Sequence, residues 1–463
     1  MPLPPLDGRQ HAVAYMSAAG HYVVQGTAGS GKTVMAVVRA AHLVNLATPN
    51  NGSTLLLTHD NSLVKYIRRL TSGLTDEVVV ETYHKFARGY LASMGLMRRN
   101  CIGEAMDSYV AEAIAAVQLT RPTSQFLLRP VKFFIDELDW ISGMGFTTAT
   151  EYFAATRVGR IDPLGPKRRE IVWQLRDAYL LVLAKYGKLY DWASIAGALR
   201  RALEGHGAGR KYRHIVVDEA QDLAPEAIRS LALSIQPGGS LTLFVDDSQQ
   251  IYGQRTSWRS CGLTVPKVEI FSENYRNTPQ IAAVAIAMAT MDHFNDTPDI
   301  VVPVAPRRAA GTRPTLFRAN SADSEIAEVR KQAASFGKSS RVAVLAHTRA
   351  EARRAVAGIS DVKMLSKDMP AWDDNPGVFY GTYYAAKGLE FEVVILPFTD
   401  RGKLPDPEAI GAFGEREAKS RESRLLYVGV TRARSELLVT YVHDLTELLP
   451  SASEPLWTVV IEK

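Results

Sequence analysis

An eight-residue segment near the N-terminus has the composition of a phosphate-binding loop. Positions 26–33 read GTAGSGKT, which fits the pattern G-x-x-x-x-G-K-[ST], and they follow an apolar run and open a helical pattern. Glycines let backbone N–H groups face phosphate oxygens, while the Lys32 ammonium reaches the β- and γ-phosphates and the Thr33 hydroxyl binds Mg²⁺. A chance match is roughly a 1–2% event at average residue usage. The segment therefore predicts a nucleoside triphosphate site whose loop residues are Gly26, Thr27, Ala28, Gly29, Ser30, Gly31, Lys32 and Thr33.

A second apolar run ends in two acids that could complete this site. The run at 214–217 is followed by Asp218 and Glu219. At the C-terminal end of a buried strand, Asp218 can hold the Mg²⁺ shell while Glu219 polarises the attacking water. The same pair could instead cap a helix, which would be the first interpretation in a chain without a phosphate loop. Because the loop is present, we expect catalysis.

The composition is that of an ordinary globular protein. The 463 residues include 46% hydrophobic and 22% charged residues, so wholesale disorder is excluded and the length suggests roughly three domains. Cys101 and Cys261 are too few for a disulfide framework and lack the paired spacing of a zinc site, which favours a reducing, cytoplasmic setting. Neither a signal peptide nor a membrane-length apolar run is found, so no membrane contact is expected. The net charge of +5 leans only slightly towards a nucleic-acid partner.

Short apolar runs alternate with helical patterns and predict an α/β fold with parallel sheets. The expected strands are 21–25, 54–58, 214–218, 241–245, 341–346 and 392–397, with helices such as 33–46 and 324–334 between them. From about residue 88 to residue 210 the pattern is mostly helical, which predicts an inserted helical domain with helices at 168–186 and 192–204. Residues 300–314 are rich in Pro, Ala and Arg and are expected to form a linker.

The inserted region also carries a cluster of positive charge. A solvated face and a nucleic-acid contact are equally good interpretations of such a cluster. Its residues are Arg157, Arg160, Lys167, Arg168 and Arg169.

Further segments resemble the UvrD/Rep/PcrA group of superfamily 1 helicases. They read DEAQD at 218–222, VDDSQQIY at 245–252, ENYRN at 273–277, GTYYAAKGLEF at 381–391 and LYVGVTRA at 426–433. Together with the phosphate loop they follow the family's order from Gln10 to Arg434, and this shared order is far more specific than any single motif. The resemblance implies two RecA-like lobes with ATP and Mg²⁺ in the cleft between them and single-stranded DNA across their tops.

The resemblance implies further nucleotide contacts. Gln10 matches the family's adenine-reading glutamine, and Tyr275 matches an aromatic residue that stacks on the base. Arg276 and Arg432 match the two arginines that the second lobe offers to the γ-phosphate. Gln249 matches the γ-phosphate sensor, and Glu390 matches a ribose contact. The implied catalytic residues are Lys32, Glu219, Gln249, Arg276 and Arg432, and the implied metal-binding residues are Thr33 and Asp218.

DNA contacts are implied in both lobes. Hydroxyl, amide and imidazole groups suit phosphate oxygens, while aromatic rings are stacking platforms for bases. The implied residues are Thr58, His59, Asn61, Thr82, His84, Tyr252, Trp258, Thr382 and Tyr384.

The chain departs from the family pattern at several of these places. The aromatic rings of Tyr252 and Phe86 could also pack in the apolar core instead of contacting DNA. The family's aromatic residue two positions after Tyr252 is Gln254 here, so Trp258 is the expected substitute. Tyr384 stands where the family often has a His, and Val34 where many members have an Arg.

The motif positions also predict how the chain divides. Residues 1–87 and 211–265 are expected to form the first lobe (1A), 88–210 a helical 1B-like insertion, and 266–463 the second lobe (2A). Between Asn277 and Gly381 lie 103 residues, too few for a full 2B domain as well as the lobe itself. After Arg434 only 29 residues remain, so a fused nuclease is not expected.

We therefore expect an ATP-dependent translocase or helicase acting on single-stranded or partly duplex DNA, with 3′-to-5′ polarity taken from the resemblance alone. An alternative is a motor subunit that acts only with a separate partner, such as a nuclease in DNA repair or anti-phage defence. A third hypothesis is an ATP-dependent switch whose nucleic-acid surface has decayed, because of Gln254 and Tyr384.

Overall fold

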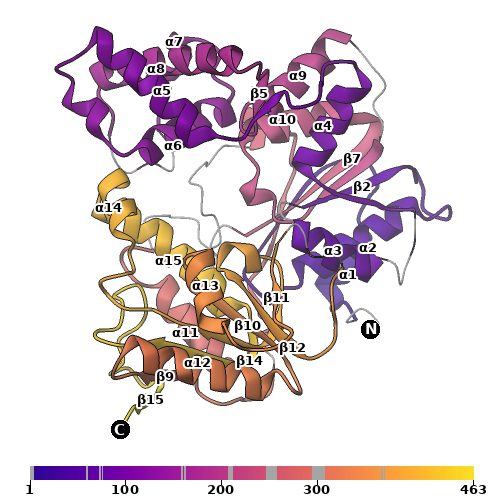
Figure 1. Ribbon diagram of the computed structural model, residues 1–463. Helices are drawn as coiled ribbons and strands as arrows, with labels where there is room; N and C mark the ends of the chain where they lie inside the picture. The colour runs from indigo at the N-terminus through magenta and orange to yellow at the C-terminus, as the bar shows by residue number, and fades with distance from the viewer. Residues whose placement is uncertain are drawn as a thin grey trace.

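The described part of the protein consists of two large parallel β-sheets and a helical region that contains a two-stranded sheet (Figure 1). The computed structural model describes residues 5–58, 61–71, 75, 77–157, 160, 163–206, 212–246, 258–294, 308–366, 369 and 371–463. In Figure 1 the helical region lies across the top, the first sheet at the right and the second sheet at the bottom. The predicted α/β class with parallel sheets is confirmed.

The first sheet has six parallel strands in the order β3-β2-β6-β7-β1-β8. They are β1 (Gly20–Gly26), β2 (Thr54–Thr58), β3 (Val79–Thr82), β6 (Tyr212–Val217), β7 (Ile235–Val245) and β8 (Val268–Phe271). Leu55 and Leu57 pack in one apolar cluster and Leu56 in another, so both faces of β2 are buried. Burial on both faces explains why these strands read as continuous apolar runs.

Six helices accompany this sheet: α1 (Gly8–Ala14), α2 (Lys32–Val44), α3 (Asn61–Thr71), α4 (Tyr83–Ser93), α9 (Ile195–His206) and α10 (Pro225–Ser234). The first sheet also extends past the boundary expected at residue 265, because β8 pairs with β1. Of the four residues of β8 only Phe271 is buried, so this edge strand gives no apolar run from which it could be predicted.

The second sheet has seven parallel strands in the order β11-β12-β10-β13-β14-β9-β15. They are β9 (Thr315–Arg318), β10 (Arg341–Ala346), β11 (Lys363–Met364), β12 (Gly377–Thr382), β13 (Phe391–Leu396), β14 (Ala433–Tyr441) and β15 (Thr458–Ile461). Its helices are α11 (Pro279–Ala289), α12 (Ala322–Phe336), α13 (Arg349–Val356), α14 (Pro407–Phe413) and α15 (Glu415–Thr431).

The helical region between α4 and α9 has an apolar core of its own, which includes Phe134, Trp140 and Leu175. Its elements are β4 (Ile102–Gly103), α5 (Met106–Thr120), the 3₁₀ turn η1 (Gln125–Leu128), α6 (Val131–Met144), α7 (Ala149–Ala154), α8 (Pro166–Lys185) and β5 (Tyr190–Asp191). The helix expected at 168–186 is α8, and the one expected at 192–204 is α9. However, α9 packs with α4 and α10 in the core of the first sheet, so the separate helical core is shorter than the span 88–210.

The basic cluster at 157–169 was interpreted as a solvated face or as a nucleic-acid contact, and most of its residues are neither. Arg157 forms an ion pair with Glu137 at 2.6 Å, and Arg160 pairs with Asp136. Arg169 donates hydrogen bonds to backbone carbonyls of the same region. These charges therefore hold the helical region together, and only Lys167 and Arg168 of the cluster are exposed.

Of the expected linker, residues 300–307 lie outside the described part, and 308–314 form no regular element. Among the helices of the described ranges, none combines the length and apolar character that a membrane crossing requires.

Candidate nucleotide site and nucleic-acid interface

The predicted phosphate loop joins β1 to α2, so the free N–H groups of the first turn of α2 border it. Gly29 and Gly31 have φ angles of +81° and +84°, in the left-handed region that glycine adopts readily. A Cβ atom at Gly29 would overlap the Asn274 side chain, and one at Gly31 would lie 2.9 Å from Gln10 Nε2. The glycines are therefore required both by the backbone conformation and by close neighbours.

Lys32 is buried at the centre of this loop. Its ammonium group donates to the carbonyl oxygens of Gly26 and Thr27, both at 2.8 Å, and lies 3.0 Å from Asp246 Oδ2. These acceptors hold the ammonium group inside the loop, where phosphate oxygens would have to compete with them.

Thr33 and Asp218 form the pair that the sequence predicts at the metal. The Thr33 hydroxyl donates to Asp218 Oδ2 at 2.7 Å. The second oxygen, Asp218 Oδ1, is buried and accepts no hydrogen bond from any residue that the structure describes. Burial, with the neighbouring Glu219 charge, raises the pKa of Asp218. An unpartnered buried carboxylate oxygen beside a hydroxyl is a donor set that suits a hard divalent cation.

Glu219 follows Asp218 in a left-handed backbone conformation, with φ of 57°. Its carboxylate accepts a hydrogen bond from the Gln221 amide. Lys387, from the turn after β12, lies 3.8 Å from Glu219 Oε2 and 2.6 Å from Asp222 Oδ1. No role was predicted for Lys387 from the sequence, although its position in the segment at 381–391 was the available signal.

The two predicted arginines lie beside this loop because of a turn at 273–277. Its backbone meets the loop where Tyr275 N donates to Gly29 O at 2.8 Å. The Asn277 amide donates to the carbonyl oxygens of Thr431, at 3.2 Å, and Ala433. Asn277 therefore fixes the backbone on both sides of Arg432, a role that the sequence analysis missed.

Arg276 and Arg432 are held differently. Arg276 Nε and Nη2 both lie 2.7 Å from Glu390 Oε1. Burial would raise the pKa of Glu390, but the positive charges of Arg276 and Arg434 outweigh it and lower the pKa. Arg432 is almost fully buried, and burial together with the Arg276 charge lowers its pKa to about 10. Glu390, predicted at the ribose, thus neutralises one arginine of a crowded cationic pair.

Gln10 and Tyr275, predicted around the nucleotide base, meet through Asp7. Gln10 Oε1 accepts from the Asp7 backbone N–H at 2.9 Å, and Gln10 Nε2 donates to Ser30 O at 2.9 Å. The Tyr275 hydroxyl donates to Asp7 Oδ2 at 2.9 Å. Both side chains therefore lie at one end of the phosphate loop, where a base could be held.

The first-lobe residues predicted to contact DNA follow the carboxyl ends of β2 and β3. Thr58 is buried, and its hydroxyl has no hydrogen-bond partner among the described residues. Thr82 accepts from Lys85 N and so caps α4, while Asn61 is exposed at the start of α3. Phe86 packs in the core of the first sheet, so the alternative of core packing is the correct one for this residue.

His84 lies beside an aromatic residue that the sequence analysis did not select. His84 Nε2 is 3.2 Å from Trp192 O, and the two rings meet edge to face at 5.2 Å. Both residues line a cavity of about 240 Å³. The available signal was a tryptophan at the end of the helical insertion, where the chain returns to the first sheet.

The second-lobe residues lie at the carboxyl end of β12 and in the turn that follows it. Thr382 accepts a hydrogen bond from Ala385 N at 3.1 Å, and Tyr384 begins a short 3₁₀ turn, Tyr384–Ala386. The turn reaches the first lobe, because a Cβ atom at Gly388 would overlap Leu63 of α3. The segment after β12 is thus in contact with helix α3 of the first lobe.

Three predicted residues, His59, Gln249 and Tyr252, lie outside the described residues, as does Gln254. Trp258 is described, in the 3₁₀ turn Trp258–Cys261, and its ring packs against the core of the first sheet.

Comparison with known families agrees with this geometry. Residues 359–444 match the UvrD-like helicase C-terminal domain, and residues 9–255, more than half of the chain, match an AAA domain. The chain belongs to the UvrD-like helicases. The resemblance stated from the motifs is therefore confirmed, and the match at 359–444 contains both the turn after β12 and Arg432 of this helicase fold.

Relatives include proteins from several bacteria. A probable DNA helicase of Mycoplasma pneumoniae is 24% identical over 455 residues, covering 91% of this chain and 81% of that protein. The ATP-dependent DNA helicase UvrD2 of Mycobacterium tuberculosis is 25% identical over 559 residues, covering 94% of this chain and 78% of that protein. A probable DNA helicase II homolog of Rickettsia conorii is 35% identical over 102 residues, which is 20% of this chain and only 16% of that protein.

Proposed function

We propose that this UvrD-like chain is an ATP-dependent motor that moves along single-stranded DNA. The observation that carries the proposal is the hydrogen bond between Thr33 and Asp218, beside which the Asp218 Oδ1 atom is buried and accepts no hydrogen bond from a described residue. Around it, Lys32, Arg276 and Arg432 come from the phosphate loop, the 273–277 turn and the end of α15. With the neighbouring acid Glu219, these residues supply what phosphoryl transfer to water needs: a cation site, a group that orients the water and positive charges for the γ-phosphate.

We infer that Thr33 and Asp218 hold Mg²⁺. When bound, the ion would neutralise charge that develops on the β- and γ-phosphates. Glu219 would orient the attacking water, and Arg276 would exchange Glu390 for the phosphate. Arg432 would add a second fixed positive charge, since its guanidinium is already held by the carbonyl oxygens of Val428 and Leu389.

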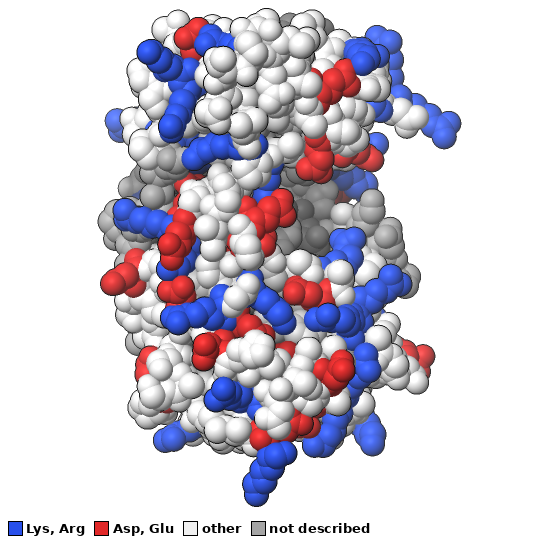
Figure 2. Space-filling model, turned by 60° about the vertical axis from the view of Figure 1, so that its left-hand side comes forward, with Lys and Arg blue, Asp and Glu red and all other residues white. Residues whose placement is uncertain are grey.

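The DNA path in this proposal crosses the carboxyl ends of both sheets. It would use Thr58, Asn61, Thr82 and His84 in the first lobe and Thr382 and Tyr384 in the second, and Trp192 is added because its ring abuts His84. The face shown in Figure 2 has blue and red side chains interspersed and no single-sign patch. Because the residues of the path offer hydroxyl, amide and imidazole groups to phosphate oxygens and aromatic rings to base faces, little base specificity is expected.

The steady-state ATPase rate with and without single-stranded DNA tests the proposal. Strong stimulation is expected in the parent protein, and its loss is expected in Lys32→Ala and Glu219→Gln. Lys331→Ala is the matched control, because this exposed lysine of α12 pairs only with Glu328 among the described residues. Stimulated hydrolysis that survives in Lys32→Ala would refute the proposed site.

Polarity and partners need separate assays. Displacement of streptavidin from biotin placed at either end of a single strand tests the 3′-to-5′ direction, and faster release from the 5′ end is expected. Basal hydrolysis without DNA stimulation would instead favour the alternative of a motor subunit that needs a separate nuclease, repair or defence protein. Recovery of the native protein alone would count against that alternative.

A further inference from the structure

The helical region is joined to the second sheet by a contact far from its own attachment point. Its apolar core includes Ala412 and Phe413 of α14 and Ala418 of α15, next to the side chains of α6. Helix α14 packs against α6, and Figure 1 shows it directly below that helix. The helical region therefore bridges the two sheet units on one side of the molecule.

Ion pairs reinforce this contact. Arg421 of α15 donates from Nη1 and Nη2 to Asp136 Oδ1 and Oδ2, each at 3.0 Å. Two parallel hydrogen bonds of this kind fix geometry as well as charge. Lys132 of α6 also lies 3.9 Å from Asp406 at the start of α14. We call the contact between α6 and the α14–α15 pair the clasp.

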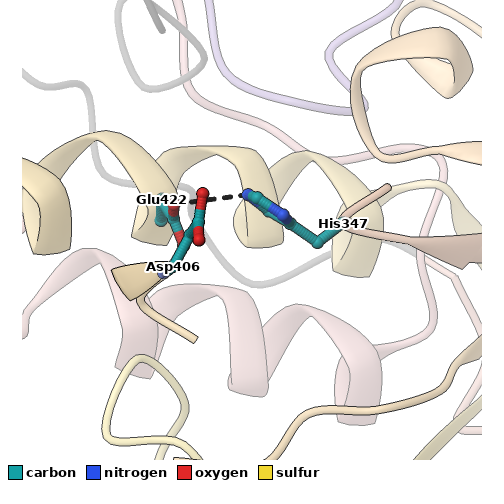
Figure 3. Close-up of side chains that lie close together, drawn as sticks. All are labelled: His347, Asp406 and Glu422. Atoms are coloured by element: carbon teal, nitrogen blue, oxygen red, sulfur yellow. Dashed lines mark hydrogen bonds and ion pairs between the residues drawn. The ribbon is translucent and has the colours of Figure 1, made fainter. Parts of the chain in front are cut away.

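The second-lobe side of the clasp is anchored by the cluster in Figure 3. Asp406 caps α14 through Glu408 N, and its own backbone N–H donates to Glu422 Oε2 at 2.9 Å. Glu422 Oε1 lies 3.3 Å from His347 Nε2, at the end of β10. Potential metal ligands gather here, but each is already used to hold the start of α14 on the second sheet.

The clasp borders the space beside the predicted DNA residue His84. The cavity of about 240 Å³ is lined on one side by Asp136, Arg160 and Arg421 and on the other by Tyr83, His84 and Asp222. Pockets for drug-sized ligands measure about 300–1,000 Å³. A DNA strand that extends over several nucleotides is larger than such a ligand and does not fit this cavity.

We propose that the clasp is an autoinhibitory contact that competes with DNA, so that a strand can occupy the space beside His84 only after α6 separates from α14 and α15. The inference rests on the proposed function, because it takes His84 as part of the DNA path. The apparent affinity for DNA equals the intrinsic affinity multiplied by the fraction of molecules in which the clasp is open. Weakening it raises that fraction.

Arg421→Gln weakens the clasp and also removes the ion pair of Arg421 with Glu417 on the same helix. It removes the bidentate pair and leaves Asp136 paired with Arg160 inside the helical region. Lys419→Gln is the matched control, because it removes one positive charge from the same helix where the partners are Glu415 and Glu447. Fluorescence anisotropy with labelled oligothymidine is expected to show a dissociation constant about fivefold lower for Arg421→Gln than for Lys419→Gln. An equal or higher value in a folded variant would overturn the proposal.

Locking the clasp is the complementary test. A Cβ atom at Gly411 of α14 would lie 4.0 Å from Pro130 Cγ at the start of α6, so the double variant Pro130→Cys/Gly411→Cys places two thiols close together and is oxidised to form the disulfide. The disulfide-linked protein is expected to keep basal ATPase activity and lose DNA binding and stimulation, and reduction is expected to restore both. The single-cysteine variants control for the substitutions.

The outcomes separate the two proposals. If the reduced double variant and the parent protein both lack DNA stimulation, the proposed function fails. If the linked and reduced forms bind DNA equally well, the proposed function stands and the clasp is not inhibitory.

Discussion

Asp218 is a fully buried carboxyl group that has one hydrogen-bonded oxygen and one without a partner among the described residues. Its raised pKa arises from burial and from Glu219. An acid whose pKa is raised on folding binds its proton more tightly in the folded state, so the free energy of unfolding falls as pH rises through that range. Asp218, which the proposed activity needs, therefore lowers the free energy of unfolding when no cation is bound.

Asp218→Asn is expected to raise the ligand-free free energy of unfolding at neutral pH by about 1 kcal/mol and to abolish ATPase activity. The amide keeps an acceptor for Thr33 and removes the buried charge. Asp246→Asn is the control, because Asp246 is ion-paired with Lys32 and its loss is expected to destabilise the fold. Urea unfolding measures both variants. Destabilisation by Asp218→Asn would contradict this account.

Single residues also show where sequence reasoning stops. The loop glycines, Thr33 and Asp218 were predictable because their spacing along the chain encodes their chemistry. Asn277 was not, since its partners Thr431 and Ala433 lie more than 150 positions away. Trp192 was missed for the same reason, because its contact with His84 exists only after the helical region folds back.

At the scale of elements, prediction succeeded where strands are buried on both faces. β2 and β10 coincide with the predicted runs 54–58 and 341–346. β12 begins with a glycine and has a second one inside it, and β14 carries Arg434 and Glu436 in its first four residues, so neither gives a continuous apolar run. The edge strand β15 reads TVVI, a β-branched run that is typical of a strand but was not among the predicted ones, and all four of its residues are exposed.

The anchor of α14 gives a pH prediction. Burial would lower the pKa of His347, but Glu422, with Asp406 and Glu351 nearby, outweighs burial and raises it. The stabilisation is fully present below the unfolded pKa of about 6.5 and is lost as pH rises through the raised value. Urea unfolding above pH about 6.5 should therefore show stability falling with pH, with a smaller slope in His347→Gln. If the fall of stability with pH has the same slope in His347→Gln or in Glu422→Gln as in the parent protein, the His347–Glu422 pair is not the source of that pH dependence.

At the scale of the whole molecule, the formal net charge is +5, and the face shown in Figure 2 carries positive and negative side chains interspersed. The logarithm of the binding constant for single strands is expected to fall linearly with the logarithm of the salt concentration, with a slope of about −0.7 per phosphate contact. The binding constant is expected to differ little between oligothymidine and mixed sequences. Anisotropy titrations from about 50 to about 200 mM salt measure both slope and base preference. A marked preference for one sequence would contradict contacts limited to backbone and ring faces.

The two lobes meet at Lys387, which follows the predicted DNA residues Thr382 and Tyr384 and ends beside Glu219. A shift of this turn on DNA would move the ammonium group relative to the catalytic acid. Lys387→Met is therefore expected to retain DNA binding and basal hydrolysis but to lose most of the DNA stimulation.

Stability complicates this test, because Lys387→Met leaves Asp222 buried without its ion pair, at a cost of about 3–5 kcal/mol. The double variant Asp222→Asn/Lys387→Met removes both charges and is expected to recover most of that stability without recovering the stimulation. Lys419→Met, which breaks the ion pair with Glu415 on α15, controls for the loss of a lysine. Full DNA stimulation in the double variant would show that Lys387 serves only the fold, since its neutral replacement would then couple the lobes equally well.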